Sequence, residues 1–180
     1  MKGVYKSDEV HGEIKMSKLV ILRGNSGSGK TTVAKGLQQK LGHGTMLISQ
    51  DVVRREMLYV KDGEKPKVSE LLFQLAVYGK EHCEVVILEG ILNSKWYDPL
   101  FKKLLKEFNK DIYAFYFDIP FDETLRRHKT KPNANEFGET ELRKWWNEND
   151  LLDCIPETLL GKELEIDEII NIIVNNLNSR

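Results

Sequence analysis

The chain has 180 residues, a hydrophobic fraction of 41% and a formal net charge of −1. This length fits one domain with a substantial core, and the abundant aliphatic and aromatic residues exclude a largely disordered chain. The near-zero charge gives no overall argument for nucleic acid or an acidic membrane as partner, and two cysteines cannot build a disulfide framework. The chain has neither a membrane-length apolar run nor an apolar export signal, so we expect a cytoplasmic protein.

Short apolar runs predict the strands of a sheet. Four of them are nearly continuous in apolarity, which is typical of strands that are buried on both faces of a parallel sheet. They cover residues 18–22, 45–48, 84–88 and 111–117, and a shorter candidate covers residues 157–160.

Amphipathic repeats between these runs predict helices. Apolar residues recur with helical spacing over residues 31–41, 68–78 and 96–108, and further helices are expected over residues 120–128, 141–149 and 165–177. Alternating strands and helices indicate a doubly wound α/β architecture. We therefore expect one domain over residues 17–180, preceded by an extension over residues 1–16.

The first predicted strand runs into a glycine-rich loop that fits the pattern G-x-x-x-x-G-K-[ST]. Glycines let such a loop turn its backbone N–H groups toward phosphate oxygens, and the following helix adds a partial positive charge at its N-terminus. Lys30 is expected to reach the β- and γ-phosphates of a bound nucleotide and Thr31 to bind Mg²⁺. The candidate cofactor-binding residues are Gly24, Asn25, Ser26, Gly27, Ser28, Gly29, Lys30, Thr31 and Thr32.

Polar residues follow the second strand, at the edge where ligands bind in open α/β sheets. Asp51 could cap the next helix, or it could accept a proton from a substrate hydroxyl near the γ-phosphate. Arg54 lies one helical turn later, where it could hold a substrate or remain a solvated charge.

Carboxylates also follow the third and fourth strands. Glu89 could hold a metal-bound water or a substrate hydroxyl, or it could bond to the backbone of the phosphate-binding loop. Either Asp51 or Glu89 could assist Thr31 at the Mg²⁺ through water. Asp118 is interpreted as a helix N-cap ahead of Pro120.

Basic residues gather after the fourth strand and lead into a turn-rich stretch. Solvated charges and a nucleic-acid patch are alternatives, but aromatic residues are not interleaved with the basic ones here. A cationic lid that closes over ATP is favoured, because it would exclude water and neutralise the transferring phosphoryl group. The lid is expected over about residues 127–145, with Arg126, Arg127 and Lys131 as its charged residues.

Four segments, in this order, carry a resemblance to a known family. They are the loop of residues 24–32, the segment of residues 48–54 around Asp51, Leu88-Glu89-Gly90, and the segment of residues 117–128 that ends in Arg126-Arg127-His128. Together they resemble the small P-loop kinases of the nucleotide and metabolite kinase type. The most similar branch holds polynucleotide-kinase-like, chloramphenicol-phosphotransferase-like and zeta-toxin-like proteins, and its sequences are often labelled uridine kinase-like.

The resemblance implies a three-layer P-loop NTPase fold with a five-stranded parallel sheet in the order 2-3-1-4-5 and a small lid. It also implies transfer of the ATP γ-phosphate with Mg²⁺. By position, Asp51 matches the catalytic base, Arg54 the substrate arginine and Arg127 the lid arginine. Lys30 and Arg127 complete the expected catalytic set with Asp51.

Three functions remain in competition. The first is a kinase acting on a hydroxyl of a nucleoside, an antibiotic or a sugar derivative, working as a monomer or homodimer. The second is a polynucleotide 5′-kinase, which would need a basic track to Asp51 where the sequence shows only Arg54 and Arg55. The third is a nucleotide-dependent regulatory binding module, which would hydrolyse ATP slowly without an acceptor.

Overall fold

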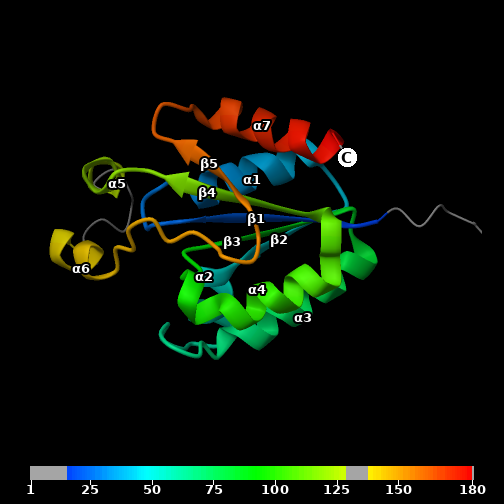
Figure 1. The fold of residues 1–180 in the computed structure, drawn as a ribbon, viewed down its shortest axis with the longest axis horizontal. Coiled ribbons are helices and arrows are strands. Elements are labelled where there is room, and N and C mark those ends of the chain that lie inside the picture. Colours follow the sequence, from blue (N-terminus) through cyan, green and yellow to red (C-terminus); the bar gives the residue numbers. More distant parts are fainter. Residues whose placement is uncertain (1–15, 129–137, 180) are drawn as a thin grey trace, which may run out of the picture.

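The computed structural model describes residues 16–128 and 138–179, and its core is a five-stranded parallel sheet (Figure 1). The strand order is β2-β3-β1-β4-β5 and every pairing is parallel, which confirms the expected α/β class and the implied order. The strands are β1 (Lys18–Gly24), β2 (Thr45–Ser49), β3 (Val85–Gly90), β4 (Ile112–Asp118) and β5 (Glu157–Gly161).

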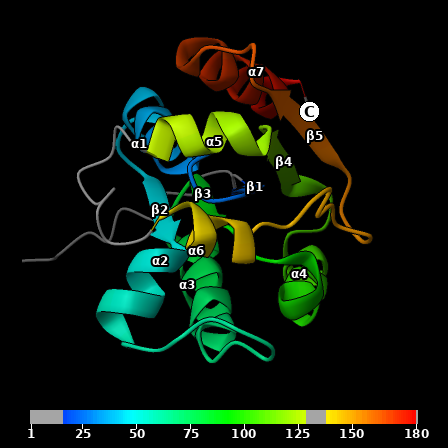
Figure 2. The ribbon, with the colours of Figure 1, turned by 90° about the vertical axis from the view of Figure 1, so that its left-hand side faces the viewer.

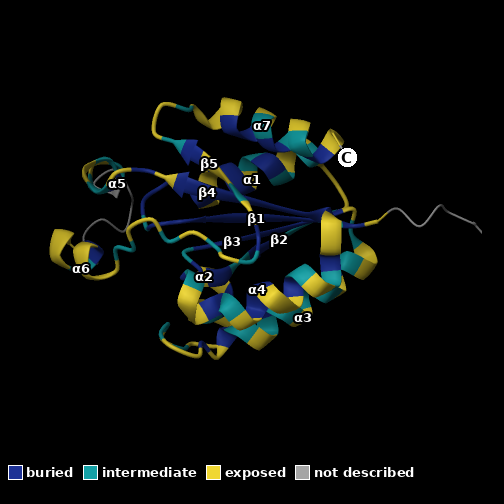
Figure 3. Ribbon diagram, in the orientation of Figure 1, coloured by how far each residue is buried: buried dark blue, intermediate teal, exposed yellow. Residues whose placement is uncertain are grey.

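Helices cover both faces of the sheet, so the described part of the chain forms three layers (Figure 1). They are α1 (Lys30–Leu41) and α7 (Ile166–Asn178) on one face, and α3 (Val68–His82) and α4 (Ser94–Phe108) on the other. Leu19 and Ile21 belong to the core with α3 and α4. Val20 and Leu22 belong to the core with α1 and α7. This burial on both faces explains the unbroken apolar runs of the central strands (Figure 3).

Short helical elements gather at the carboxyl edge of the sheet. Figure 2 looks onto this edge, with α5 and α6 in front of the strand ends. These elements are α2 (Gln50–Val52), the π-helix η1 (Val53–Met57), α5 (Phe121–His128) and α6 (Glu139–Lys144). A 3-10 turn, η2 (Asn109–Asp111), leads into β4 at the opposite edge. The carboxyl edge therefore combines the strand ends with short, irregular segments.

Two sequence-based predictions of helix ends are wrong. The helix expected over residues 141–149 is α6, which ends at Lys144 because the chain turns there: Trp146 N–H donates to the Arg143 carbonyl, and Asn149 has a φ of 49°. Asp118 is the last residue of β4 and not an N-cap, since α5 begins only at Phe121.

Some expectations fall outside the described residues. These are the extension, apart from Met16, and the middle of the expected lid with Lys131. Within the described segments 16–128 and 138–179, none of the helices is both long and apolar enough to cross a membrane.

Candidate active site at the carboxyl edge of the sheet

The phosphate-binding loop connects β1 to α1 and needs its glycines. Gly27 and Gly29 have φ values of 86° and 102°, a region that side chains with a Cβ rarely adopt. A Cβ at Gly27 would lie 2.8 Å from the backbone oxygen of Thr124 in α5. The loop therefore turns tightly and packs directly against α5.

Lys30, the first residue of α1, is 6% exposed and folds back over the loop. Its Nζ donates to the Asn25 carbonyl at 2.7 Å and to the Ser28 hydroxyl at 3.1 Å. Thr31 and Thr32 are exposed in the next positions of the helix. The amino group thus lies within the curve of the loop, beside the N-terminus of α1, where a phosphate group is favoured.

Glu89, the penultimate residue of β3, joins the loop to the end of β2. Its carboxylate accepts hydrogen bonds from the Thr31 hydroxyl at 3.2 Å and from the Ser49 hydroxyl at 2.5 Å, and the residue is 3% exposed. Oxygen donors of this kind suit Mg²⁺, which commonly takes one or two protein ligands beside substrate phosphates. Thr31 and Glu89 therefore fit a Mg²⁺ ion, and they would hold it.

Asp51 and Arg54 form a contact pair next to this chain of hydrogen bonds. Asp51 lies inside α2, for which Ser49 occupies the N-cap position, so the capping interpretation of Asp51 is wrong. Asp51 Oδ1 accepts from Arg54 Nη2 at 2.7 Å and lies 3.4 Å from Arg55 Nε. The Asp51 side chain is 58% exposed and that of Arg54 is 14% exposed. An open carboxylate thus stands beside a guanidinium whose position is restrained.

A polar network with buried members lies beside this pair, and the sequence analysis did not predict it. Gln50 donates at 2.9 Å to both Asp62 and the Tyr97 hydroxyl, and the Tyr97 hydroxyl donates to Asp62 at 2.8 Å. Burial and the neighbouring Asp62 raise the pKa of Tyr97, so its hydroxyl remains a donor. Arg54 Nη1 also donates to the Val60 carbonyl at 3.3 Å. The loop between η1 and α3 is therefore tied to the site at several points.

Of the two expected lid cations that the structure describes, Arg127 contacts the phosphate-binding loop. Its Nη1 donates to the Ser28 carbonyl at 3.2 Å, and its Nε donates to Glu123 at 2.6 Å. Arg126 also bonds to Glu123, but its side chain is 73% exposed. Hydrogen bonds from Arg126 and Arg127 lower the pKa of Glu123 to about 2. Arg127 is thus already oriented toward the loop by an ionised carboxylate.

A buried ionic cluster lies directly behind the loop, and sequence reasoning missed it too. Arg23 in β1 is fully buried and donates to Asp150 at 2.8 Å, to Glu157 at 2.9 Å and to the Leu92 carbonyl at 3.0 Å. Burial raises the pKa of Glu157. An arginine inside an apolar strand was the available signal, because such a charge must find buried partners.

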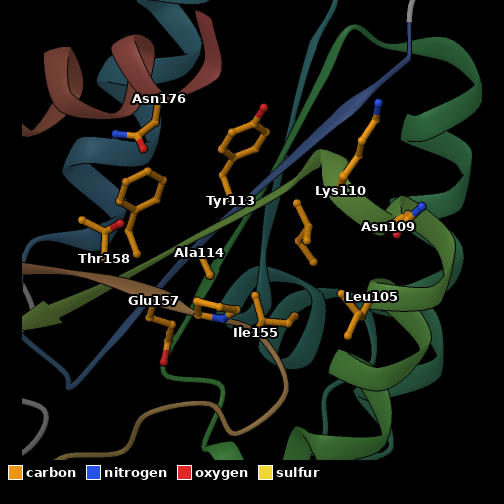
Figure 4. Close-up of a pocket in the computed structure, with 12 residues that line it drawn as sticks. Leu105, Asn109, Lys110, Tyr113, Ala114, Ile155, Glu157, Thr158 and Asn176 are labelled. Atoms are coloured by element: carbon orange, nitrogen blue, oxygen red, sulfur yellow. The ribbon is translucent and has the colours of Figure 1, made fainter. Parts of the chain in front are cut away.

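A hollow of about 300 Å³ lies away from these groups (Figure 4). It opens between the end of α4, the strands β4 and β5, and Asn176 of α7. Its lining includes Leu105, Ala114 and Ile155, with Glu157 at one side. The hollow contains no residue of the phosphate-binding loop, so it is separate from the candidate active site.

The fold and this edge define the class of the protein: a P-loop NTPase fold of the small-kinase type. A family model described as "AAA domain" matches residues 19–148, and the chain belongs to this family. The resemblance noted in the sequence is thereby confirmed at the level of family and fold. Among curated proteins, none matches the chain significantly.

Solved structures share the fold. The APS kinase of Mycobacterium tuberculosis, in complex with AMPPNP and APS, has a TM-score of 0.69 and 21% identity, covering 91% of this chain and 99% of its own. A gluconokinase from Sinorhizobium meliloti 1021 has a TM-score of 0.63 and 12% identity, covering 91% and 93%. A sugar kinase from Janibacter sp. HTCC2649 has a TM-score of 0.60 and 15% identity, covering 90% and 95%. At these identities the likeness supports the common fold.

Proposed function

We propose that this protein is an ATP-dependent kinase that transfers the γ-phosphate to a hydroxyl group of a small molecule. One observation carries the proposal. The Thr31 hydroxyl, the Glu89 carboxylate and the Ser49 hydroxyl form a chain of hydrogen bonds from the phosphate-binding loop to the segment that bears Asp51. The residues proposed to hold a triphosphate are thereby linked to the segment that bears the proposed proton acceptor, which supports one shared site.

The proposed roles follow from the charge that develops during phosphoryl transfer. Such transfer depends mostly on positioning and on electrostatic stabilisation of the phosphoryl oxygens. The backbone N–H groups of residues 24–30 and Lys30 would hold the triphosphate. Thr31 and Glu89 would hold Mg²⁺, which supplies additional positive charge when bound. Arg127, already in contact with Ser28, would neutralise charge from the side of α5.

Asp51 is assigned to the acceptor. An ionised carboxylate next to the transferring group can orient a hydroxyl and receive its proton. Arg54 would bind another oxygen of the same acceptor, because its contact with Asp51 and the Val60 carbonyl restrains its guanidinium. Both residues are also predicted from the sequence to share a ligand, and the 2.7 Å contact supports that prediction.

The test is an acceptor panel read by transfer of labelled γ-phosphate. Nucleosides, aminoglycosides, chloramphenicol and sugar derivatives are compared with a reaction that lacks acceptor. We expect one class to raise the rate well above the background hydrolysis. Slow hydrolysis that no acceptor stimulates, combined with nucleotide-dependent binding of another protein, would favour the regulatory module instead.

Matched variants separate the roles. Asp51→Asn is expected to remove transfer and to leave ATP binding near that of the wild type, whereas Lys30→Met is expected to weaken ATP binding. Asp98→Asn and Lys35→Met serve as controls, because Asp98 forms a surface ion pair on α4 and Lys35 is exposed on α1. Full transfer activity in Asp51→Asn would contradict the assignment of the base.

A second candidate, a polynucleotide 5′-kinase, is favoured by a specific surface. A hollow of about 650 Å³ has Glu64 and Glu70 in its lining, and also three lysines and an aromatic residue: Lys65, Lys67, Lys95 and Trp96. All four side chains are exposed, and the hollow adjoins the loop that Arg54 contacts through Val60. Lysines and an aromatic ring can bind the phosphates and a base of a single strand.

The same panel distinguishes this candidate. Oligonucleotides with a 5′-hydroxyl are added, together with the corresponding nucleosides. A preference for the oligonucleotides that falls steeply with rising salt, and that weakens in Lys65→Gln, would support the second candidate. Equal use of nucleosides at all salt concentrations would exclude it.

A further inference from the structure

The chain between α6 and β5 contacts the phosphate-binding loop through Asn147. The Asn25 side chain pairs with the backbone of Asn147 in both directions: its Nδ2 donates to the Asn147 carbonyl at 2.7 Å, and its Oδ1 accepts from the Asn147 N–H at 2.9 Å. Asn25 is 5% exposed. The loop is therefore held from outside by a segment that is 122 residues distant in the sequence.

The side chain of Asn147 extends this connection to α4. Its Oδ1 accepts from Asn93 Nδ2 at 2.8 Å, and its Nδ2 donates to the Trp145 carbonyl at 3.0 Å. Asn93 is the N-cap of α4, where its Oδ1 accepts from the N–H groups of Lys95 and Trp96. Asn147 thus lies between the phosphate-binding loop and the first turn of a helix in the opposite layer.

A second attachment holds the same segment three residues later. Asp150 accepts from the Ser94 hydroxyl at 2.5 Å and from Arg23 at 2.8 Å. This attachment joins the segment to the core, whereas the attachment at Asn147 reaches the loop itself. The two attachments can therefore be separated by substitution.

Asn25 is engaged at its backbone as well as at its side chain. Its carbonyl accepts from Lys30 Nζ at 2.7 Å. The orientation of the peptide between Asn25 and Ser26 thus determines both where Lys30 lies and where the N–H groups of the loop point. A group that must bind phosphate gains affinity when its geometry is held in advance.

We propose that Asn147 is a positioning residue for nucleotide binding. It holds Asn25, and through Asn25 the phosphate-binding loop, in the arrangement that receives the triphosphate. This inference rests on one part of the proposed function, the binding of ATP by the phosphate-binding loop, and does not depend on the acceptor. It adds a residue outside the loop motif, and it ties ATP affinity to the hydrogen bond between Asn147 and Asn93.

A double-mutant cycle tests this inference. Asn147→Ala removes the acceptor of the bond, and Asn93→Ser removes the donor while keeping a residue type that caps helices well. Each is expected to raise the Kd and KM for ATP about fivefold, as loss of one partly buried hydrogen bond implies, with kcat changed less than twofold. The double variant should bind ATP no less tightly than the single variant with the lower affinity, because the two single substitutions remove the same hydrogen bond.

Asn171→Ala is the matched control, since it removes a surface hydrogen bond with Lys40 on the far side of α1 and α7. Unchanged ATP affinity in Asn147→Ala, or losses that simply add in the double variant, would overturn the inference. Should a variant fail to fold, hydrogen exchange of the wild-type protein decides. ATP should slow exchange of the amides of residues 145–150, and unaltered exchange there would overturn the inference as well.

The outcomes for the two proposals are distinct. A wild-type protein that does not bind ATP would contradict the proposed function and the inference together. A protein that binds ATP but transfers to no acceptor would contradict the proposed function alone. ATP binding that is insensitive to both Asn147 and Asn93 would contradict the inference alone.

Discussion

Replacing Arg23 with methionine should destabilise the protein strongly. The guanidinium is fully buried and donates five hydrogen bonds to four groups: the Asp150 and Glu157 carboxylates and the Leu92 and Asp150 carbonyls. The methionine side chain is also long and unbranched, but it has no hydrogen-bond donor. The substitution leaves two carboxylates without their cation, and breaking a buried ion pair in this way costs about 3–5 kcal/mol.

The loss should depend on pH, because Glu157 can take up a proton. Burial already raises the pKa of Glu157, and the charge of Arg23 opposes that rise. Without Arg23 the folded-state pKa rises further. A raised carboxyl pKa contributes stability that is fully present below the unfolded value and is lost as pH rises through the folded value. The free-energy deficit of Arg23→Met should therefore be larger at pH 8 than at pH 5.

Urea denaturation at the two pH values measures both effects. For a chain of this size, a loss of 3–5 kcal/mol corresponds to a decrease in Tm of roughly 6–20 °C. Arg126→Met is the control: the Arg126 side chain in its ion pair with Glu123 is 73% exposed, so this substitution should lower the free energy of unfolding far less than Arg23→Met does. Adding Glu157→Gln to Arg23→Met should recover part of the loss at pH 8.

Two results would refute this reasoning. A deficit below about 1 kcal/mol would mean that the cluster contributes little net stability, as happens when desolvation cancels the attraction between buried charges. A deficit that is equal at pH 5 and pH 8 would mean that Glu157 does not carry the uncompensated charge. Either result would also weaken the view that this cluster anchors the segment after α6.

Three further substitutions probe the site. Gly27→Ala should abolish nucleotide binding in a direct titration, since its φ is 86° and its Cβ would lie 2.8 Å from the Thr124 oxygen. Glu89→Gln should raise the Mg²⁺ concentration needed for half-maximal turnover at least several-fold, because it removes the negative charge beside the expected metal; an unchanged requirement would place the metal elsewhere. Tyr97→Phe should cost about 1–3 kcal/mol in urea denaturation, because Asp62 loses a buried donor.

The phosphate-binding loop and the polar strand ends could be predicted from local patterns. A glycine-rich turn between an apolar run and an amphipathic helix has few alternative structures, and parallel strands bring their carboxyl ends to one edge. These two rules suffice to predict that Lys30, Asp51 and Glu89 gather at the carboxyl edge of the sheet. They do not show which atoms meet, so the contact of Glu89 with both Thr31 and Ser49 came from the structure.

The attachments of the loop could not be predicted because they depend on the path of the chain between distant elements. Asn25 and Asn147 meet only if α6 ends early and the following segment crosses the strand ends. The helical pattern around residue 145 continues past that point, so periodicity alone extends the helix too far. Tertiary hydrogen bonds to Asn147 and Asp150 favour the turn over continued helix. Their partners are distant in the sequence, so the local sequence pattern does not predict them.

The first turn of α4 joins the two sides of the site. Asn93 bonds to Asn147, which holds the phosphate-binding loop, and Tyr97 bonds to Asp62 and Gln50 beside the acceptor residues. Asn93 and Tyr97 are one helical turn apart, so the phosphate-binding loop and the acceptor residues are both attached to the same end of α4. Phosphoryl transfer is sensitive to small errors in the distance between donor and acceptor. A substitution that tilts α4 should therefore reduce transfer more than it reduces the binding of either substrate, since it displaces the two sites relative to each other.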